Sequence, residues 1–163
     1  MTETPKIAVL FVCMGNICRS PTAHTVFRQR VAAAGLADRI VIESAGTHDY
    51  HVGATTDRRA CEAGGERGYT FTDRRARQVD PFDLERFDYV LAMDRANLDD
   101  LQRLQDERTR AEIRLFLSDV PDAVDDEVPD PYYGATNGFE QVLDMVEAGS
   151  DALLARLRQR HGL

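Results

Sequence analysis

The chain has 163 residues and a formal net charge of -8, with 43% hydrophobic and 29% charged residues. This length and composition are typical of one globular domain with its own core, so we expect a single domain over residues 1–163. The negative charge argues against nucleic acid as a partner, because binding to a phosphate backbone requires an excess of Lys and Arg. The longest apolar run, at 7–13, is too short for membrane insertion.

The three cysteines form neither a zinc-site spacing nor a paired redox motif. Reduced thiols are therefore expected, which is typical of a cytoplasmic protein. The four histidines are scattered along the chain, and none is assigned to a metal.

Strand patterns and helix patterns alternate along the chain. The run from Ile7 to Val12 is continuously aliphatic, which is typical of a strand buried on both faces. In chain order, the expected elements are a strand at 7–12, a helix at 21–34, a strand at 40–44, a helix at 56–64, a strand at 87–93, a helix at 94–105, a strand at 113–117 and a helix at 137–159. This alternation implies parallel strands joined by right-handed crossovers, hence an α/β sandwich. Ligands in such sheets bind beyond the carboxyl ends of the strands, which points to the residues after Val12.

The segment that follows the first strand, Cys13–Pro21, has the pattern of a phosphate-binding loop. Backbone N–H groups between a buried strand and a helix start can converge on an anion, and the helix dipole adds to them. Gly15 and Asn16 are the residue types that best tolerate the positive φ of such a loop. Ser20 is a good N-cap residue, and Pro21 suits the first position of a helix.

Two residues of this loop are candidates for the chemistry. The thiolate of Cys13 is favoured by the loop amides, the helix terminus, the Ser20 hydroxyl and the charge of Arg19. Arg19 can return across the loop and bind two phosphoryl oxygens with its planar guanidinium group. A buried structural cysteine is the simpler interpretation of Cys13 alone, but the strand, the Gly-Asn turn and the Ser-Pro helix start favour a nucleophile.

Transfer of a phosphoryl group to sulfur also requires a proton donor for the leaving oxygen, and Asp130 is the best candidate. Prolines on both sides stiffen its backbone. An Asp-Pro pair on its own is usually only a turn. Tyr132 and Tyr133 can stack on an aromatic substrate, although tyrosines beside turns are commonly packing residues.

These motifs together resemble those of the low-molecular-weight protein tyrosine phosphatases. The matching segments are Cys13-x5-Arg19-Ser20, Ser44–Thr47, Phe87–Asp94 with Asn97-Leu98, and Asp130–Tyr133. The resemblance extends in the expected order from Ile7 to the final helix. It implies an α/β fold with a four-stranded parallel sheet flanked by helices on both faces, and hydrolysis of phosphate monoesters without metal or cofactor. It also implies that Cys13 is the nucleophile, that Arg19 binds the phosphoryl group and that Asp130 is the general acid and base.

Supporting roles follow from the same resemblance. Asn16 and Ser44 match positions that hold the phosphate loop in shape, and Ser20 matches the position that stabilises the thiolate. Cys18 matches a second cysteine that forms a reversible disulfide with Cys13 after oxidation. The expected substrate-binding residues are Met14, Gly15, Asn16, Ile17, Cys18, Ser20, and the aromatic cleft residues Tyr50, Tyr132 and Tyr133.

Two features depart from the family pattern. The segment 53–57 lacks the prolines usual there, and Arg74 stands where many members carry a histidine that supports the loop asparagine.

The expected partners are proteins that contain phosphotyrosine, with an autophosphorylated tyrosine kinase among them, and phosphate as product and competitive inhibitor. We expect a monomer or weak dimer.

Two other functions fit parts of the pattern. Thioredoxin-linked arsenate reductases share this fold and loop, but they need two further cysteines close together in the second half, and this chain has none after Cys61. A non-catalytic module that binds phosphotyrosine needs the loop without turnover, and the complete set of Cys13, Arg19 and Asp130 argues against it. The choice of phosphotyrosine over phosphoserine depends on the aromatic rim and on a pocket too deep for short side chains.

Overall fold

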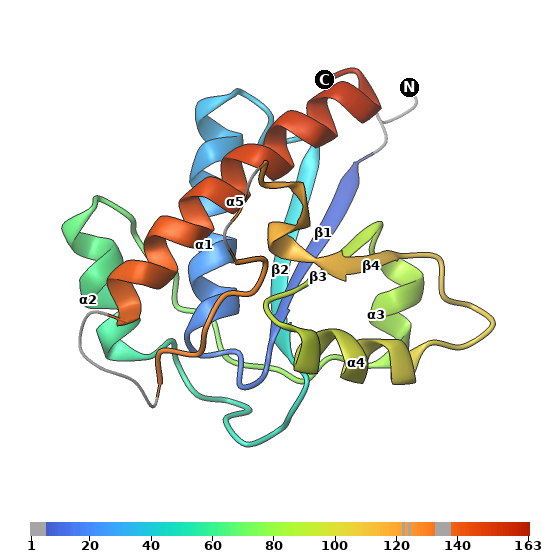
Figure 1. Ribbon diagram of the computed structural model, residues 1–163, viewed down its shortest axis with the longest axis horizontal. Helices are drawn as coiled ribbons and strands as arrows, with labels where there is room; N and C mark the ends of the chain where they lie inside the picture. The colour runs from blue at the N-terminus through green and yellow to red at the C-terminus, as the bar shows by residue number, and fades with distance from the viewer. Residues whose placement is uncertain (1–5, 122, 124, 133–137) are drawn as a thin grey trace.

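The computed structural model describes residues 6–121, 123, 125–132 and 138–163 (Figure 1). Its centre is a sheet of four parallel strands in the order β2-β1-β3-β4. The strands are β1 (Ile7–Cys13), β2 (Ile40–Gly46), β3 (Tyr89–Ala92) and β4 (Glu112–Leu115). The predicted four-stranded parallel sheet is confirmed.

Helices cover both faces of this sheet. They are α1 (Arg19–Ala33), α2 (Arg58–Glu66), α3 (Pro81–Arg86), α4 (Arg95–Leu104), the short 3-10 helix η1 (Phe116–Asp119) and α5 (Gly138–His161). In Figure 1, α1 lies to the left of the strands, α5 runs diagonally from the lower left to the upper right, and α3 and α4 lie to the right. The three-layer arrangement predicted from the alternation of elements is therefore present. No helix in the described part of the chain combines the length and the apolar character needed to cross a membrane.

Most element boundaries differ by one or two residues from the sequence-based prediction, and one helix was not predicted. The strand expected to run to Leu117 ends at Leu115, and the chain turns into η1. The helix expected from Pro21 begins two residues earlier, at Arg19. Helix α3 was not predicted, although its start carries a capping box in which Asp80 and Asp83 each accept a hydrogen bond from the other's backbone N–H.

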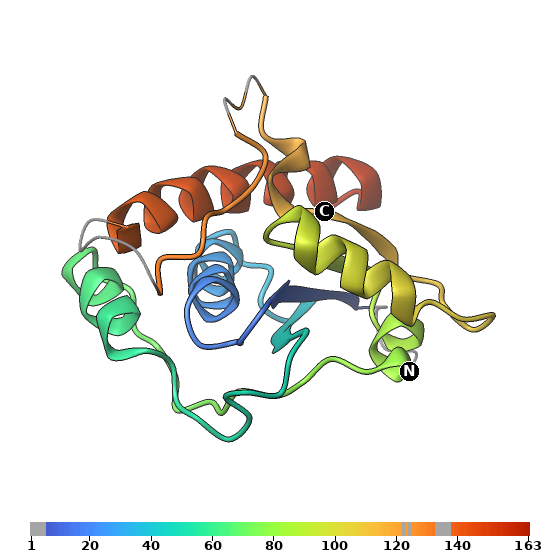
Figure 2. The same ribbon diagram turned by 60° about the horizontal axis from the view of Figure 1, so that its bottom comes forward.

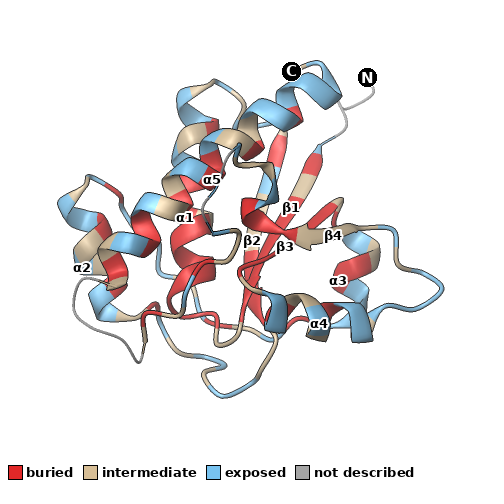
Figure 3. Ribbon diagram, viewed as in Figure 1, coloured by how far each residue is buried: buried red, intermediate tan, exposed pale blue. Residues whose placement is uncertain are grey.

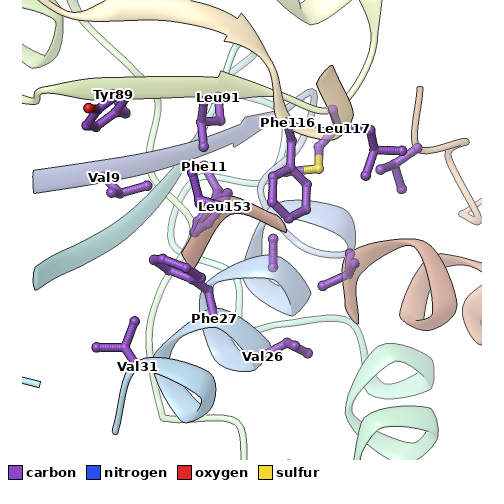
Figure 4. Packing of buried hydrophobic residues seen from close by; sticks show 14 of the residues in the cluster. Val9, Phe11, Val26, Phe27, Val31, Tyr89, Leu91, Phe116, Leu117 and Leu153 are labelled. Atoms are coloured by element: carbon purple, nitrogen blue, oxygen red, sulfur yellow. The ribbon is translucent and has the colours of Figure 1, made fainter. Parts of the chain in front are cut away.

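The alternating side chains of β1 supply the cores on both sides of the sheet. Val9 and Phe11 pack with α1 and α5, whereas Leu10 and Val12 pack with α3 and α4. Phe11 is fully buried, and its ring makes edge-to-face contacts with Phe27 at 5.7 Å and Phe116 at 5.1 Å between ring centroids (Figure 4). Burial is concentrated in the strands and on the inward helix faces (Figure 3). This packing fixes β1 as the rigid support of the loop that follows it.

The carboxyl ends of β1 and β2 lie side by side, toward the bottom of Figure 1. Here the loop after β1 meets the long segment between β2 and α2 (Figure 2). Cys13, the last residue of β1, is paired in register with Gly46, the last residue of β2. A Cβ at Gly46 would lie 2.7 Å from the carbonyl oxygen of Met14, so only glycine allows this close approach.

Candidate active site

The loop between β1 and α1 wraps in the way that its residue types predict, with one difference. Asn16 has a φ of 59°, in the left-handed region, as expected. Gly15 does not have a positive φ, so the reason given for it in the sequence analysis is wrong. Its lack of a side chain matters for another reason, because a Cβ there would lie 2.9 Å from Cδ2 of His51.

Cys13 lies at the start of this loop, and the residue is 2% exposed. Its Sγ atom is 3.0 Å from the Ser20 hydroxyl and 3.3 Å from the backbone nitrogen of Asn16, which donates to it. The side-chain Nδ2 of Asn16 donates to the Ser20 hydroxyl at 2.8 Å, so that hydroxyl can direct its own hydrogen toward the sulfur. These donors and the N-terminal end of α1 stabilise negative charge on the sulfur.

Ser20 therefore has a different role from the N-cap expected for it. Because α1 begins at Arg19, its N-cap is Cys18, which makes no side-chain capping bond. The prediction of Ser20 as the N-cap is wrong, since tertiary contacts turn its hydroxyl toward Cys13 instead.

Asn16 is held from behind by the segment between α2 and α3. Its side-chain oxygen accepts from Nη2 of Arg74 at 2.7 Å and from the backbone nitrogen of Arg77 at 3.0 Å. Nη2 of Arg74 also donates to the carbonyl oxygen of Ser44 at 3.3 Å. The Ser44 hydroxyl lies 3.4 Å from Nδ1 of His24, so Ser44 acts on the loop through its backbone and Arg74.

Arg19 is 2% exposed, and two residues hold its guanidinium group: Asp94, which precedes α4, and Val128, in the segment before Asp130. Its Nη1 donates to Oδ2 of Asp94 at 2.6 Å and to the carbonyl oxygen of Val128 at 3.0 Å. Burial opposes the charge of Arg19, but the negative charges of Cys13, Asp94 and Asp130 outweigh it and raise the pKa of Arg19. The guanidinium group is therefore charged and fixed in orientation.

Sequence reasoning did not assign Asp94 to the site. Asp94 also caps α4, since its Oδ1 accepts from the backbone nitrogen of Asn97 at 2.9 Å. The available signal was its position directly after β3, at the same sheet edge as Cys13.

Asp130 lines the same cleft as the phosphate loop. Its Oδ1 accepts from the backbone nitrogen of Tyr132 at 3.0 Å, and its Oδ2 is 3.6 Å from Nη2 of Arg19. One carboxyl oxygen is thus oriented by the backbone of its own turn, and the other faces the guanidinium group.

A cleft brings these groups together. Its lining residues are Cys13, Met14, Gly15, Ile17, Cys18, Arg19, His51, Asp130 and Tyr132. His51 was not predicted, and its ring lies 5.8 Å from that of Tyr132. Tyr50 is 71% exposed, stacks on His48 at 5.1 Å and is not among the lining residues. Tyr133 lies outside the described residues.

Cys18 is the second cysteine of the cleft, and it is buried and free, like Cys13. Burial, reinforced by the Asp57 carboxylate, raises the pKa of the Cys18 thiol well above its usual value. Cys18 is therefore a protonated thiol in the same cleft as Cys13.

Comparison with known proteins decides the family. The sequence model of one family, low molecular weight phosphotyrosine protein phosphatase, matches residues 8–162. The chain belongs to this family. A low molecular weight protein-tyrosine-phosphatase of Streptomyces coelicolor is 46% identical over 155 residues, which cover 93% of this chain and 94% of the relative.

Solved structures of low molecular weight phosphatases have the same fold. YfkJ of Bacillus subtilis matches with a TM-score of 0.91 and 38% identity, over 98% of this chain and 99% of that one. A protein tyrosine phosphatase of Entamoeba histolytica, crystallised with Hepes in its active site, matches with a TM-score of 0.90 and 36% identity, over 96% of this chain and 99% of that one. The predicted family, fold class and enzyme class, a phosphatase among the hydrolases, are confirmed.

Proposed function

We propose that this phosphatase hydrolyses phosphotyrosine in protein substrates through a covalent phosphocysteine on Cys13. The observation that supports this most is the convergence of a buried sulfur, a buried guanidinium group and a carboxyl group in one cleft. Cys13, Arg19 and Asp130 come from the end of β1, the start of α1 and the loop before α5, and all three line it.

In the first step, the Cys13 thiolate attacks phosphorus in line with the leaving phenolate. The S–P bond forms as the P–O bond breaks, and Asp130 donates its proton to the departing oxygen. The loop N–H groups and Arg19 bind the equatorial oxygens, where negative charge is spread in the transition state. Because Asp94 and Val128 already hold Arg19 in orientation, little further ordering is needed when the phosphoryl group arrives.

In the second step, water attacks the phosphocysteine. Asp130, now ionised, accepts a proton from this water as the new O–P bond forms and the S–P bond breaks. The Cys13 thiolate is regenerated, with the Ser20 hydroxyl and the Asn16 N–H as its hydrogen-bond donors. Inorganic phosphate leaves as the product and, because it fits the same loop, acts as a competitive inhibitor.

The preference for phosphotyrosine follows from the depth and walls of the cleft. Cys13 lines the cleft, and so do His51 and Tyr132, whose ring centroids are 5.8 Å apart. A phenyl ring can pack against these rings while its phosphate reaches the buried Cys13, whereas the short side chain of phosphoserine cannot bring its phosphate as far in. Tyr50 is exposed near this rim, where it can contact the substrate protein.

The proposed setting of the reaction is a reducing compartment such as the cytoplasm, which suits an enzyme whose nucleophile must remain a free thiol. The expected partners are phosphotyrosine proteins, with an autophosphorylated tyrosine kinase as one class, and the expected state is a monomer or weak dimer.

The test is hydrolysis of p-nitrophenyl phosphate at about pH 5.5, in the presence of a chelator, by the wild type and by Cys13→Ser and Asp130→Ala. We expect turnover that resists the chelator, is abolished by Cys13→Ser and falls about 100-fold or more in Asp130→Ala. Phosphotyrosine and phosphoserine peptides of one sequence then test the substrate. A wild type that binds phosphate without turnover would contradict the proposal.

A further inference from the structure

Arg59 lies between α2 and the segment that carries the proposed general acid. Its guanidinium carbon is 5.2 Å from the centre of the Tyr132 ring and 4.8 Å from the centre of the Phe139 ring. Its Nη1 also donates to the carbonyl oxygen of Tyr132 at 3.3 Å. Arg59 therefore contacts the loop of Asp130 and the first turn of α5 with one planar group.

The same guanidinium group is fastened to the phosphate loop through Asp57. Nε and Nη2 of Arg59 donate to the two carboxyl oxygens of Asp57, at 3.1 Å and 2.9 Å. This forked bond is the main reason that the pKa of Asp57 is lowered. The backbone nitrogen of Asp57 donates to the carbonyl oxygen of Ile17 at 2.8 Å.

The far end of this chain of contacts is the Asp130 carboxyl group. The Tyr132 carbonyl oxygen accepts from Arg59, and the Tyr132 backbone nitrogen donates to Oδ1 of Asp130 at 3.0 Å. Hydrogen bonds, joined by the covalent bonds of Asp57, Arg59 and Tyr132, thus link Ile17 in the phosphate loop to Asp130. Arg59 is not among the residues that line the cleft.

We propose that Arg59 is a positioning residue, which fixes the Asp130 carboxyl group relative to the Cys13 sulfur without touching the substrate. The inference rests on the proposed function, since it assumes that Asp130 protonates the leaving group. An exposed ion pair alone contributes little to stability, and the side chain of Arg59 is 47% exposed. We infer that Arg59 acts through its orientation, because the two bonds to Asp57 and the contacts with the Tyr132 and Phe139 rings are all made by one planar guanidinium group.

Arg58 is the matched control for Arg59. It is the preceding residue on α2, its side chain is 90% exposed, and its Nε donates to Glu62 at 2.8 Å on the helix surface. Arg58→Ala and Arg59→Ala therefore remove the same group from the same helix, but only Arg59→Ala interrupts the path to Asp130.

The test is kcat/KM for phenyl phosphate and for p-nitrophenyl phosphate, since the more basic phenolate needs the proton of Asp130 more. We expect Arg59→Ala to lower kcat/KM about tenfold for phenyl phosphate and about threefold or less for p-nitrophenyl phosphate. Arg58→Ala should match the wild type with both substrates. In an Asp130→Ala background, Arg59→Ala should cause no further loss, because the group that it positions is gone.

Equal losses for both substrates, or the same loss with and without Asp130, would overturn the inference. If Arg59→Ala does not fold, Arg59→Lys decides by the same comparison, because lysine keeps the charge but not the planar fork. An Asp130→Ala variant as active as the wild type would instead contradict the proposed function, so the two failures are distinguishable.

Discussion

Nη2 of Arg74 donates a hydrogen bond of 2.7 Å to Oδ1 of Asn16, directly behind the phosphate loop. Asn16 is fully buried and has a left-handed backbone conformation, so its side-chain bonds stabilise a costly loop geometry. A guanidinium group keeps its charge at every pH at which the enzyme can work, which a histidine does not. The support of this loop is therefore independent of pH.

Removal of this support should impair catalysis more than stability. We expect Arg74→Ala to lower kcat/KM for p-nitrophenyl phosphate about tenfold, because the loop N–H groups lose their alignment, and to cost about 1–2 kcal/mol of unfolding free energy. Steady-state kinetics and urea unfolding measure the two effects. Arg75→Ala, at an exposed neighbouring side chain, is the control and should match the wild type. Full activity in Arg74→Ala would show that the loop holds its shape without this bond.

Asp94 should control the binding of phosphate through Arg19. Asp94→Asn keeps a residue type that caps α4 but removes the negative charge that faces Nη1 of Arg19. We expect the inhibition constant for inorganic phosphate to rise about tenfold, with the melting temperature nearly unchanged. Asp100→Asn, which loses only a surface ion pair with Arg103 on the same helix, serves as the control. An unchanged inhibition constant in Asp94→Asn would mean that Arg19 is oriented without Asp94.

His24 should make the fold less stable in acid. Burial, together with the charges of Arg74 and Arg28, lowers the pKa of His24 from 6.5 to about 4. His24 therefore binds a proton more readily in the unfolded chain than in the folded one. The free energy of unfolding is unaffected by this difference above about pH 6.5, and it decreases as the pH falls toward 4, by up to about 3 kcal/mol. Urea unfolding followed by far-UV circular dichroism should give a steeper loss between pH 7 and about 4.5 in the wild type than in His24→Gln. Parallel pH profiles would contradict this expectation.

The two cysteines of the cleft should respond differently to peroxide. Cys13, the proposed nucleophile, should be oxidised first to a sulfenic acid, and the thiol of Cys18, whose pKa burial raises, can then form a disulfide with it and release water. Activity lost to brief peroxide treatment should return with thiol reductant in the wild type and in the control Cys61→Ser. In Cys18→Ser, the recovered fraction should be several-fold smaller, because the sulfenic acid oxidises further. The same recovery in all three proteins would exclude Cys18 from the protection of Cys13.

The fold was predictable because its signals are local. The aliphatic run of β1, the loop that starts at Cys13 and the alternation of later strands and helices each lie within a short window of sequence. Helix α3 also had a local signal in Asp80, Pro81 and Asp83, but its six residues carry too little apolar periodicity to stand out.

The parts of the site that local sequence patterns do not reveal depend on residues far apart in the chain. Asp94, which was not assigned to the site, reaches Arg19 across 75 positions, and Arg74, which only the family resemblance placed behind the loop asparagine, reaches Asn16 across 58. Such pairs depend on the tertiary packing of the loop, which no local pattern encodes.

The measurement that tests the central claim most directly is the trapping of the covalent intermediate. Wild type and Cys13→Ser are mixed with p-nitrophenyl phosphate, denatured in acid within milliseconds, digested and examined by mass spectrometry. The account predicts one phosphoryl group on the wild-type peptide that contains Cys13, formed as fast as the first p-nitrophenol is released, and none on the corresponding Cys13→Ser peptide. Steady p-nitrophenol release with no phosphorylated Cys13 peptide at any time would contradict it.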